Sequence, residues 1–125
     1  MASILIIDDD EVMRSLFLEI VTEAGHEAAT AETSEEGREL ADKLKPDLIL
    51  TDIFMPEEGG FEVIRSVKKS SPETKIIAIS GFDLRQEVDV LALAKQYGAD
   101  ETFQKPVHAQ ILTETINLLL SSDAS

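Results

Sequence analysis

The sequence has no cysteine, no apolar run of membrane-spanning length and few basic residues. Without cysteine it can form no disulfide and offers no thiolate ligand to a metal. Because no signal peptide precedes the first apolar segment, and no run approaches the roughly 20 residues of a membrane span, we expect a cytoplasmic protein with no membrane partner. Its 11 Lys and Arg against 25 Asp and Glu give a formal net charge of -14. This charge argues against nucleic acid as a partner and favours basic protein surfaces or metal cations.

The length and hydrophobic share of the chain predict one packed domain. The chain has 125 residues, of which 43% are hydrophobic, enough for a core without disulfides. We expect a single domain over residues 1–125, with its core at about 3–120 and a polar tail at 121–125. A solvated acidic surface accounts for most of the negative charge.

The hydrophobic pattern alternates between short strands and amphipathic helices. Continuous aliphatic runs are typical of strands buried on both faces, and apolar residues at three- and four-residue spacing are typical of helices. The predicted strands are 4–7, 26–31, 48–51, 75–79 and 102–104. The predicted helices are 12–24, 33–44, one starting near 61, 85–97 and 107–119. Five alternations predict a doubly wound α/β fold, a parallel sheet with helices on both faces.

Polar residues follow four of the five predicted strands. Asp8 and Asp9 come after the first strand, Asp52 ends the third, Ser80 ends the fourth and Lys105 follows the fifth. In an open parallel sheet, ligands bind outside the carboxyl ends of the strands. We therefore expect three carboxylates, a hydroxyl and an ammonium to converge on one edge.

These groups together suit magnesium and a phosphoryl group. Mg²⁺ takes oxygen ligands and would offset the charge of the carboxylates. Lys105 can pair with a phosphoryl group, Ser80 can donate a hydrogen bond to it, and Asp52 can attack phosphorus to form an aspartyl phosphate. Taken singly, each residue has a simpler role in a cap or a turn. The third carboxylate of the run, Asp10, fits a helix N-cap better than a metal ligand.

Four segments resemble the response-regulator receiver domain of bacterial two-component signalling. They are ILIIDDDE, DLILTDIFMPEEGGFEVI, KIIAISG and GADETFQKPV, and the resemblance spans residues 3 to 120. It implies a flavodoxin-like, five-stranded sheet in the order 2-1-3-4-5. It also implies a phosphohistidine donor on a sensor histidine kinase or histidine phosphotransfer protein, and a downstream protein target.

The resemblance also implies a role for each matching residue. Asp52 matches the phosphoacceptor, Asp9 the direct metal ligand, and Asp8 the acid that reaches the metal through water. The carbonyl of Phe54 matches the backbone metal ligand. The remaining matches are Ser80 with the switch hydroxyl, Lys105 with the active-site lysine, and Pro106 with a cis lysine–proline bond.

Two positions depart from the usual receiver pattern. Thr102 stands where the family usually has Tyr or Phe, and the 25 residues from Ser80 to Lys105 exceed the usual spacing. Because threonine cannot supply a swinging aromatic ring, we expect the segment 81–86 to carry the phosphorylation signal instead. Neither departure affects the phosphorylation chemistry.

Three functions fit the sequence. The first is a stand-alone receiver that takes a phosphoryl group onto Asp52 with Mg²⁺ and signals, or relays the group, by protein contact. It would catalyse only its own phosphorylation and dephosphorylation. The alternatives are a Mg²⁺-dependent phosphohydrolase and a receiver-like interaction module that is never phosphorylated. The intact set of Asp9, Asp52, Ser80 and Lys105 argues against the interaction module. No cap segment for a substrate pocket is apparent in the sequence, and neither histidine is expected at the site, which argues against the phosphohydrolase.

Overall fold

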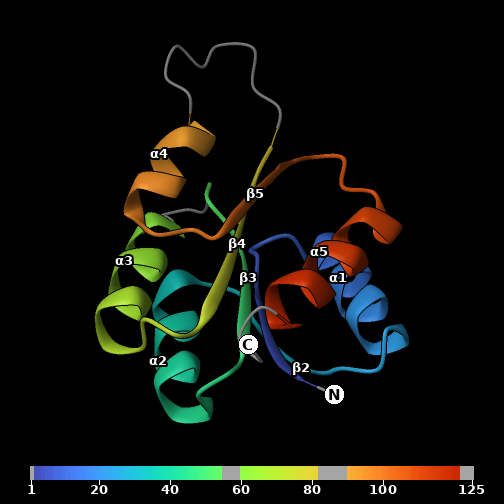
Figure 1. Cartoon of the computed structure of the whole chain (residues 1–125), viewed down its shortest axis with the longest axis horizontal. Helices are drawn as coiled ribbons and strands as arrows, with labels where there is room; N and C mark the ends of the chain where they lie inside the picture. The colour runs from blue at the N-terminus through green and yellow to red at the C-terminus, as the bar shows by residue number, and fades with distance from the viewer. Residues whose placement is uncertain (1, 55–59, 82–89, 122–125) are drawn as a thin grey trace.

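A sheet of five parallel strands forms the centre of the molecule (Figure 1). The computed structural model describes residues 2–54, 60–81 and 90–121. The strands lie in the order β2-β1-β3-β4-β5, so the predicted order is confirmed. Their bounds are β1 Ser3–Ile7, β2 Glu27–Ala31, β3 Leu48–Asp52, β4 Lys75–Ser80 and β5 Glu101–Gln104.

Helices cover both faces of this sheet (Figure 1). Helices α1 and α5 pack on one face, where Phe17 and Leu112 meet Ile4 and Ile6 of β1. Helices α2, α3 and α4 cover the other face, where Leu5 and Ile7 of β1 are buried. These residues alternate with Ile4 and Ile6, because neighbouring strand residues point to opposite sides of a sheet. The helices span α1 Glu11–Glu23, α2 Ser34–Leu44, α3 Gly60–Ser70, α4 Val90–Tyr97 and α5 Ala109–Ser121.

Polar side chains fix where the first two helices begin. The Asp10 carboxylate accepts a hydrogen bond from the Val12 N–H at 2.9 Å, so the N-cap interpretation of Asp10 is confirmed. The Thr33 hydroxyl accepts from the Glu36 N–H at 3.1 Å, while the Glu36 carboxylate accepts from the Glu32 N–H at 2.9 Å. These caps set the start of the helices that follow β1 and β2.

Some element ends differ from the sequence-based expectation. His26 precedes β2, because its N–H still bonds to the Val21 carbonyl at the end of α1. Helix α5 begins at Ala109 and not at 107, since its first turn closes on the His108 carbonyl. Ser121 belongs to α5 and not to the polar tail.

Three expectations fall wholly or largely outside the described residues. Helix α4 is described from position 90, so the start expected at 85 lies outside, as does most of the segment 81–86. Residues 122–125 of the expected tail also lie outside. Among the described helices, none is long and apolar enough to cross a membrane.

Candidate functional site

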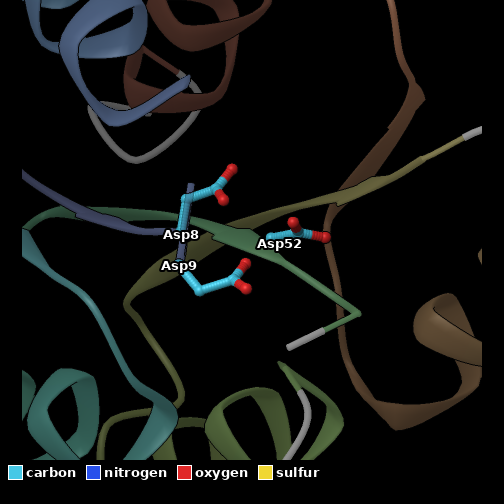
Figure 2. Close-up of side chains that lie close together, drawn as sticks. All are labelled: Asp8, Asp9 and Asp52. Carbon is cyan, nitrogen blue, oxygen red and sulfur yellow. The ribbon is translucent and has the colours of Figure 1, made fainter. Parts of the chain in front are cut away.

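Three aspartates meet at the carboxyl edge of the sheet. Asp8 follows the last residue of β1, and Asp52 is the last residue of the neighbouring strand β3. Figure 2 shows their side chains together with that of Asp9. One carboxylate oxygen from each of the three lies within 4.8 Å of the others. The predicted convergence of these carboxylates is therefore found, and its cause is the pairing of β1 with β3.

The burial of two of these carboxylates disfavours their charged forms. Asp8 is 1% exposed and Asp52 is 6% exposed, whereas Asp9 is open to solvent. Taking a carboxylate out of water disfavours its charged form, and a second carboxylate nearby disfavours it further. A cation at this edge would relieve both costs.

Lys105 supplies one such cation. Its Nζ lies 3.2 Å from Asp52 Oδ2 and 3.4 Å from Asp8 Oδ2. The residue stands just after β5, at the start of the Lys105–Pro106 peptide bond, which is cis as the resemblance implies. The ammonium group of Lys105 therefore pairs with the carboxylates of Asp8 and Asp52.

The pKa values of the central pair follow from this geometry. Burial, and then the negative charge of Asp8, raise the pKa of Asp52 to about 6, although Lys105 and the Phe54 N–H act in the opposite direction. Burial alone would lower the pKa of Lys105, but the charges of Asp52 and Asp8 together outweigh it, so this pKa is raised. At neutral pH Lys105 therefore carries its positive charge, and Asp52 is ionised but binds a proton more readily than an ordinary aspartate.

Phe54 and Ser80 lie at the same edge. The Phe54 N–H donates to Asp52 Oδ1 at 3.0 Å; a metal-ligand role for its carbonyl stays a prediction. Ser80 is buried at the end of β4, and its carbonyl accepts from the Lys105 N–H at 2.8 Å. The Ser80 hydroxyl donates to the Gly81 carbonyl at 3.1 Å, and its bond to a phosphoryl group also stays a prediction.

Asp10 stands apart from the cluster of three carboxylates. The carboxylates that come together are those of Asp8, Asp9 and Asp52, whereas Asp10 caps α1. Its N–H donates to Asp8 Oδ1 at 2.9 Å. Asp10 therefore helps to orient Asp8 through its backbone.

Two residues near the site were missed by the sequence analysis. A Cβ at Gly60, the first residue of α3, would overlap the Asp52 carbonyl oxygen, so only glycine fits there. Arg14 of α1 reaches back to the Asp8 carbonyl. A signal for Arg14 was available, because it is the sole Lys or Arg among the first 37 residues of the sequence.

Comparison with known proteins gives one consistent family. The family model described as the response regulator receiver domain matches residues 4–117. The chemotaxis protein CheY of Thermotoga maritima is 37% identical, with 91% of this chain and 93% of that protein covered. The transcriptional regulatory protein AfsQ1 of Streptomyces coelicolor is 33% identical over 96% of this chain, which spans 52% of AfsQ1.

Solved structures agree with the sequence relatives. The crystal structure of a response regulator receiver domain protein from Clostridium thermocellum matches with a TM-score of 0.91 and 31% identity. That match covers 99% of this chain and 98% of the other. With the strand order, the acidic cluster and the family match over nearly the whole chain, the protein belongs to the response regulator receiver domain family.

Proposed function

We propose that this receiver domain accepts a phosphoryl group from a phosphohistidine onto Asp52. The observation that carries the proposal is the setting of Asp52, a buried carboxylate at a strand end with an ammonium 3.2 Å away. Membership of the receiver family supports the same role. The domain would act as a signalling module, and the only reactions it catalyses would be its own phosphorylation and dephosphorylation.

The proposed step is a phosphoryl transfer between two side chains. An Asp52 carboxylate oxygen attacks phosphorus, and the bond from phosphorus to the donor histidine nitrogen breaks. The electron pair of that bond stays on the imidazole nitrogen, which takes up a proton. The product on this chain is an aspartyl phosphate.

Lys105 and Ser80 would serve the transferred group. Lys105 lies between Asp8 and Asp52, so its ammonium can pair with a phosphoryl oxygen next to Asp52. Ser80 would turn its hydroxyl from the Gly81 carbonyl to a phosphoryl oxygen. Both contacts place positive charge or a donor where negative charge develops.

The donor set fits magnesium. Asp8, Asp9 and Asp52 offer only oxygen ligands, and their closeness is what a hard divalent cation requires. We propose that these three carboxylates and the Phe54 carbonyl hold Mg²⁺. When bound, the ion supplies positive charge that stabilises the phosphoryl group during transfer.

The domain would act with protein partners on both sides of the phosphoryl transfer. The donor would be a sensor histidine kinase or a histidine phosphotransfer protein, and the output a contact with a downstream protein. We further propose that residues 1–125 form one receiver domain, which acts in the cytoplasm. Similarity to CheY and to the protein PilH of Pseudomonas aeruginosa, which is 35% identical with 99% of PilH covered, supports one receiver domain over nearly the whole of this sequence.

Acetyl phosphate separates the proposal from its two alternatives. The chain is incubated with acetyl phosphate and Mg²⁺, while intact mass and released phosphate are followed together. A receiver gains the mass of one phosphoryl group, and phosphate release follows the decay of that adduct. Fast, continuous release without an adduct would indicate a phosphohydrolase. No adduct and no release would indicate an interaction module that is never phosphorylated.

A further inference from the structure

Arg14 links helix α1 to the ends of two strands. One guanidinium nitrogen donates to the Asp8 main-chain carbonyl at 2.9 Å, and the other lies 3.4 Å from the Glu32 carboxylate. The Arg14 side chain is 14% exposed, which is low for a residue on an outer helix. Asp8 follows β1 and Glu32 follows β2, so one side chain spans the segments that leave both strands.

The main-chain N–H, the carbonyl and both carboxylate oxygens of Asp8 each have a polar partner. Its N–H donates to the Ala31 carbonyl at 3.1 Å, and its Oδ1 accepts from the Asp10 N–H at 2.9 Å. Its Oδ2 lies 3.4 Å from Lys105 Nζ, and its carbonyl accepts from Arg14. The bond from Arg14 is the one that acts on the peptide joining Asp8 to Asp9.

That peptide determines how Asp9 reaches the cluster. The Asp8 carbonyl and the Asp9 nitrogen belong to one planar unit, so a bond that fixes the carbonyl also fixes the plane from which Asp9 departs. Asp9 is open to solvent, and its carboxylate nonetheless comes within 4.8 Å of those of Asp8 and Asp52. The orientation of this peptide is therefore a condition for the three oxygens to converge (Figure 2).

We propose that Arg14 is a positioning residue for the metal site, with Glu32 holding its guanidinium in place. The inference rests on the proposed function in one respect, that the three carboxylates bind Mg²⁺. Groups that hydrogen-bond to metal ligands orient them, and their loss typically costs 10- to 100-fold in metal affinity or activity. Arg14 would orient its ligand residue in a related way, through the main-chain carbonyl of Asp8. Its effect should appear in metal affinity, beyond any effect on folding.

The test compares Arg14→Gln with Arg65→Gln. Arg65 is a matched control, because it is also a helical arginine paired with a glutamate, Glu62 at 2.7 Å, but that pair is not at the site. Backbone amide shifts of the full chain are titrated with MgCl₂ at a temperature where both variants are folded. We expect the Kd of Arg14→Gln to rise roughly tenfold and that of Arg65→Gln to match the unaltered chain.

Two further variants separate positioning from a merely structural role. Arg14→Lys can donate to the Asp8 carbonyl but cannot bridge to Glu32 as a guanidinium does, so we expect it to recover part of the affinity. Glu32→Gln should weaken binding less than Arg14→Gln. If Arg14→Gln does not fold, these two variants decide: affinities equal to that of the unaltered chain in both would overturn the inference.

The outcomes also separate this inference from the proposed function. If the unaltered chain binds Mg²⁺ and Arg14→Gln binds it equally well, the positioning role is wrong and the proposed function stands. If the unaltered chain shows no saturable response at Asp8 and Asp9, both fall. In phosphorylation by acetyl phosphate, Arg14→Gln should need more Mg²⁺ for half its maximal rate but approach the usual rate at saturating Mg²⁺.

Discussion

Lys105 Nζ lies 3.2 Å from Asp52 Oδ2, although 52 residues separate the two in the sequence. The contact brings the segment after β5 to the end of β3. It compensates only part of the negative charge, because Asp8 and Asp9 lie in the same cluster. The excess negative charge at this edge of the sheet therefore lowers the stability of the folded chain.

Asp52→Asn should stabilise the metal-free protein at neutral pH. Burial and the charge of Asp8 raise the pKa of Asp52 from 3.8 to about 6 in the folded chain. The folded state thus binds more protons than the unfolded state between these values, so the contribution of Asp52 to stability falls as pH rises through them. The asparagine removes this cost, which is on the order of 2–3 kcal/mol above pH 6.

Denaturant unfolding at several pH values measures this effect. The advantage of Asp52→Asn should be full above about pH 6 and should shrink as pH falls toward 3.8. Asp42→Asn, an exposed acid of α2, serves as control and should show no such advantage. A loss of stability in Asp52→Asn at pH 7.5 would contradict the described balance of charges.

Mg²⁺ should raise the melting temperature through Asp9. A ligand that binds only the folded state at ten times its Kd stabilises it by about 1.4 kcal/mol, which shifts the melting temperature by a few degrees. Asp9→Asn should reduce this response. Glu11→Gln, another exposed acid close by in the sequence, should keep it.

Thermal melts with and without millimolar MgCl₂ provide the measurement. Equal Mg²⁺ responses of the Asp9 and Glu11 variants would mean that the ion binds to the acidic surface in general. The comparison is informative because the chain carries 25 Asp and Glu residues.

Gly60→Ala should disturb Asp52, the proposed phosphoacceptor, from the main-chain side. The Gly60 N–H bonds to the Ile53 carbonyl at 2.9 Å, and an added Cβ would overlap the Asp52 carbonyl. Overpacking of this kind costs roughly 1–3 kcal/mol. We expect lower stability together with slower phosphorylation of Asp52.

Gly81→Ala is the matched control for that substitution. Among the residues that the structure describes, none lies within 4 Å of a Cβ added at position 81, although Gly81 follows Ser80 directly at the same edge. Unfolding free energy and the rate of adduct formation are measured for both variants. Equal effects of the two alanines would show that the contact of Gly60 with Asp52 is unimportant.

The sequence was sufficient to predict the sheet and the acidic cluster. Parallel strands end at one edge, so Asp8 after β1, Asp52 at the end of β3 and Lys105 after β5 had to converge. The observed contacts of Lys105 with the two aspartates confirm this convergence. The alternation of strands and helices could also be predicted from the sequence, because buried parallel strands are short and continuously apolar.

Other features depend on distances that no local pattern records. The long side chain of Arg14 extends back beyond the start of α1 to the Asp8 carbonyl. Helix periodicity predicts only the face of the helix on which Arg14 lies. The need for glycine at position 60 comes from the approach of α3 to the Asp52 carbonyl. The signalling role expected for segment 81–86 stays a prediction, since residues 82–89 lie outside the described part of the chain.

The central claim is that Asp52 carries the phosphoryl group. Intact mass is measured for the unaltered chain, Asp52→Asn and Asp42→Asn after incubation with acetyl phosphate and Mg²⁺. The account predicts the gain of one phosphoryl group in the unaltered chain and in Asp42→Asn, and no gain in Asp52→Asn. A gain of the same size in folded Asp52→Asn would place the phosphoryl group on another residue and contradict the account.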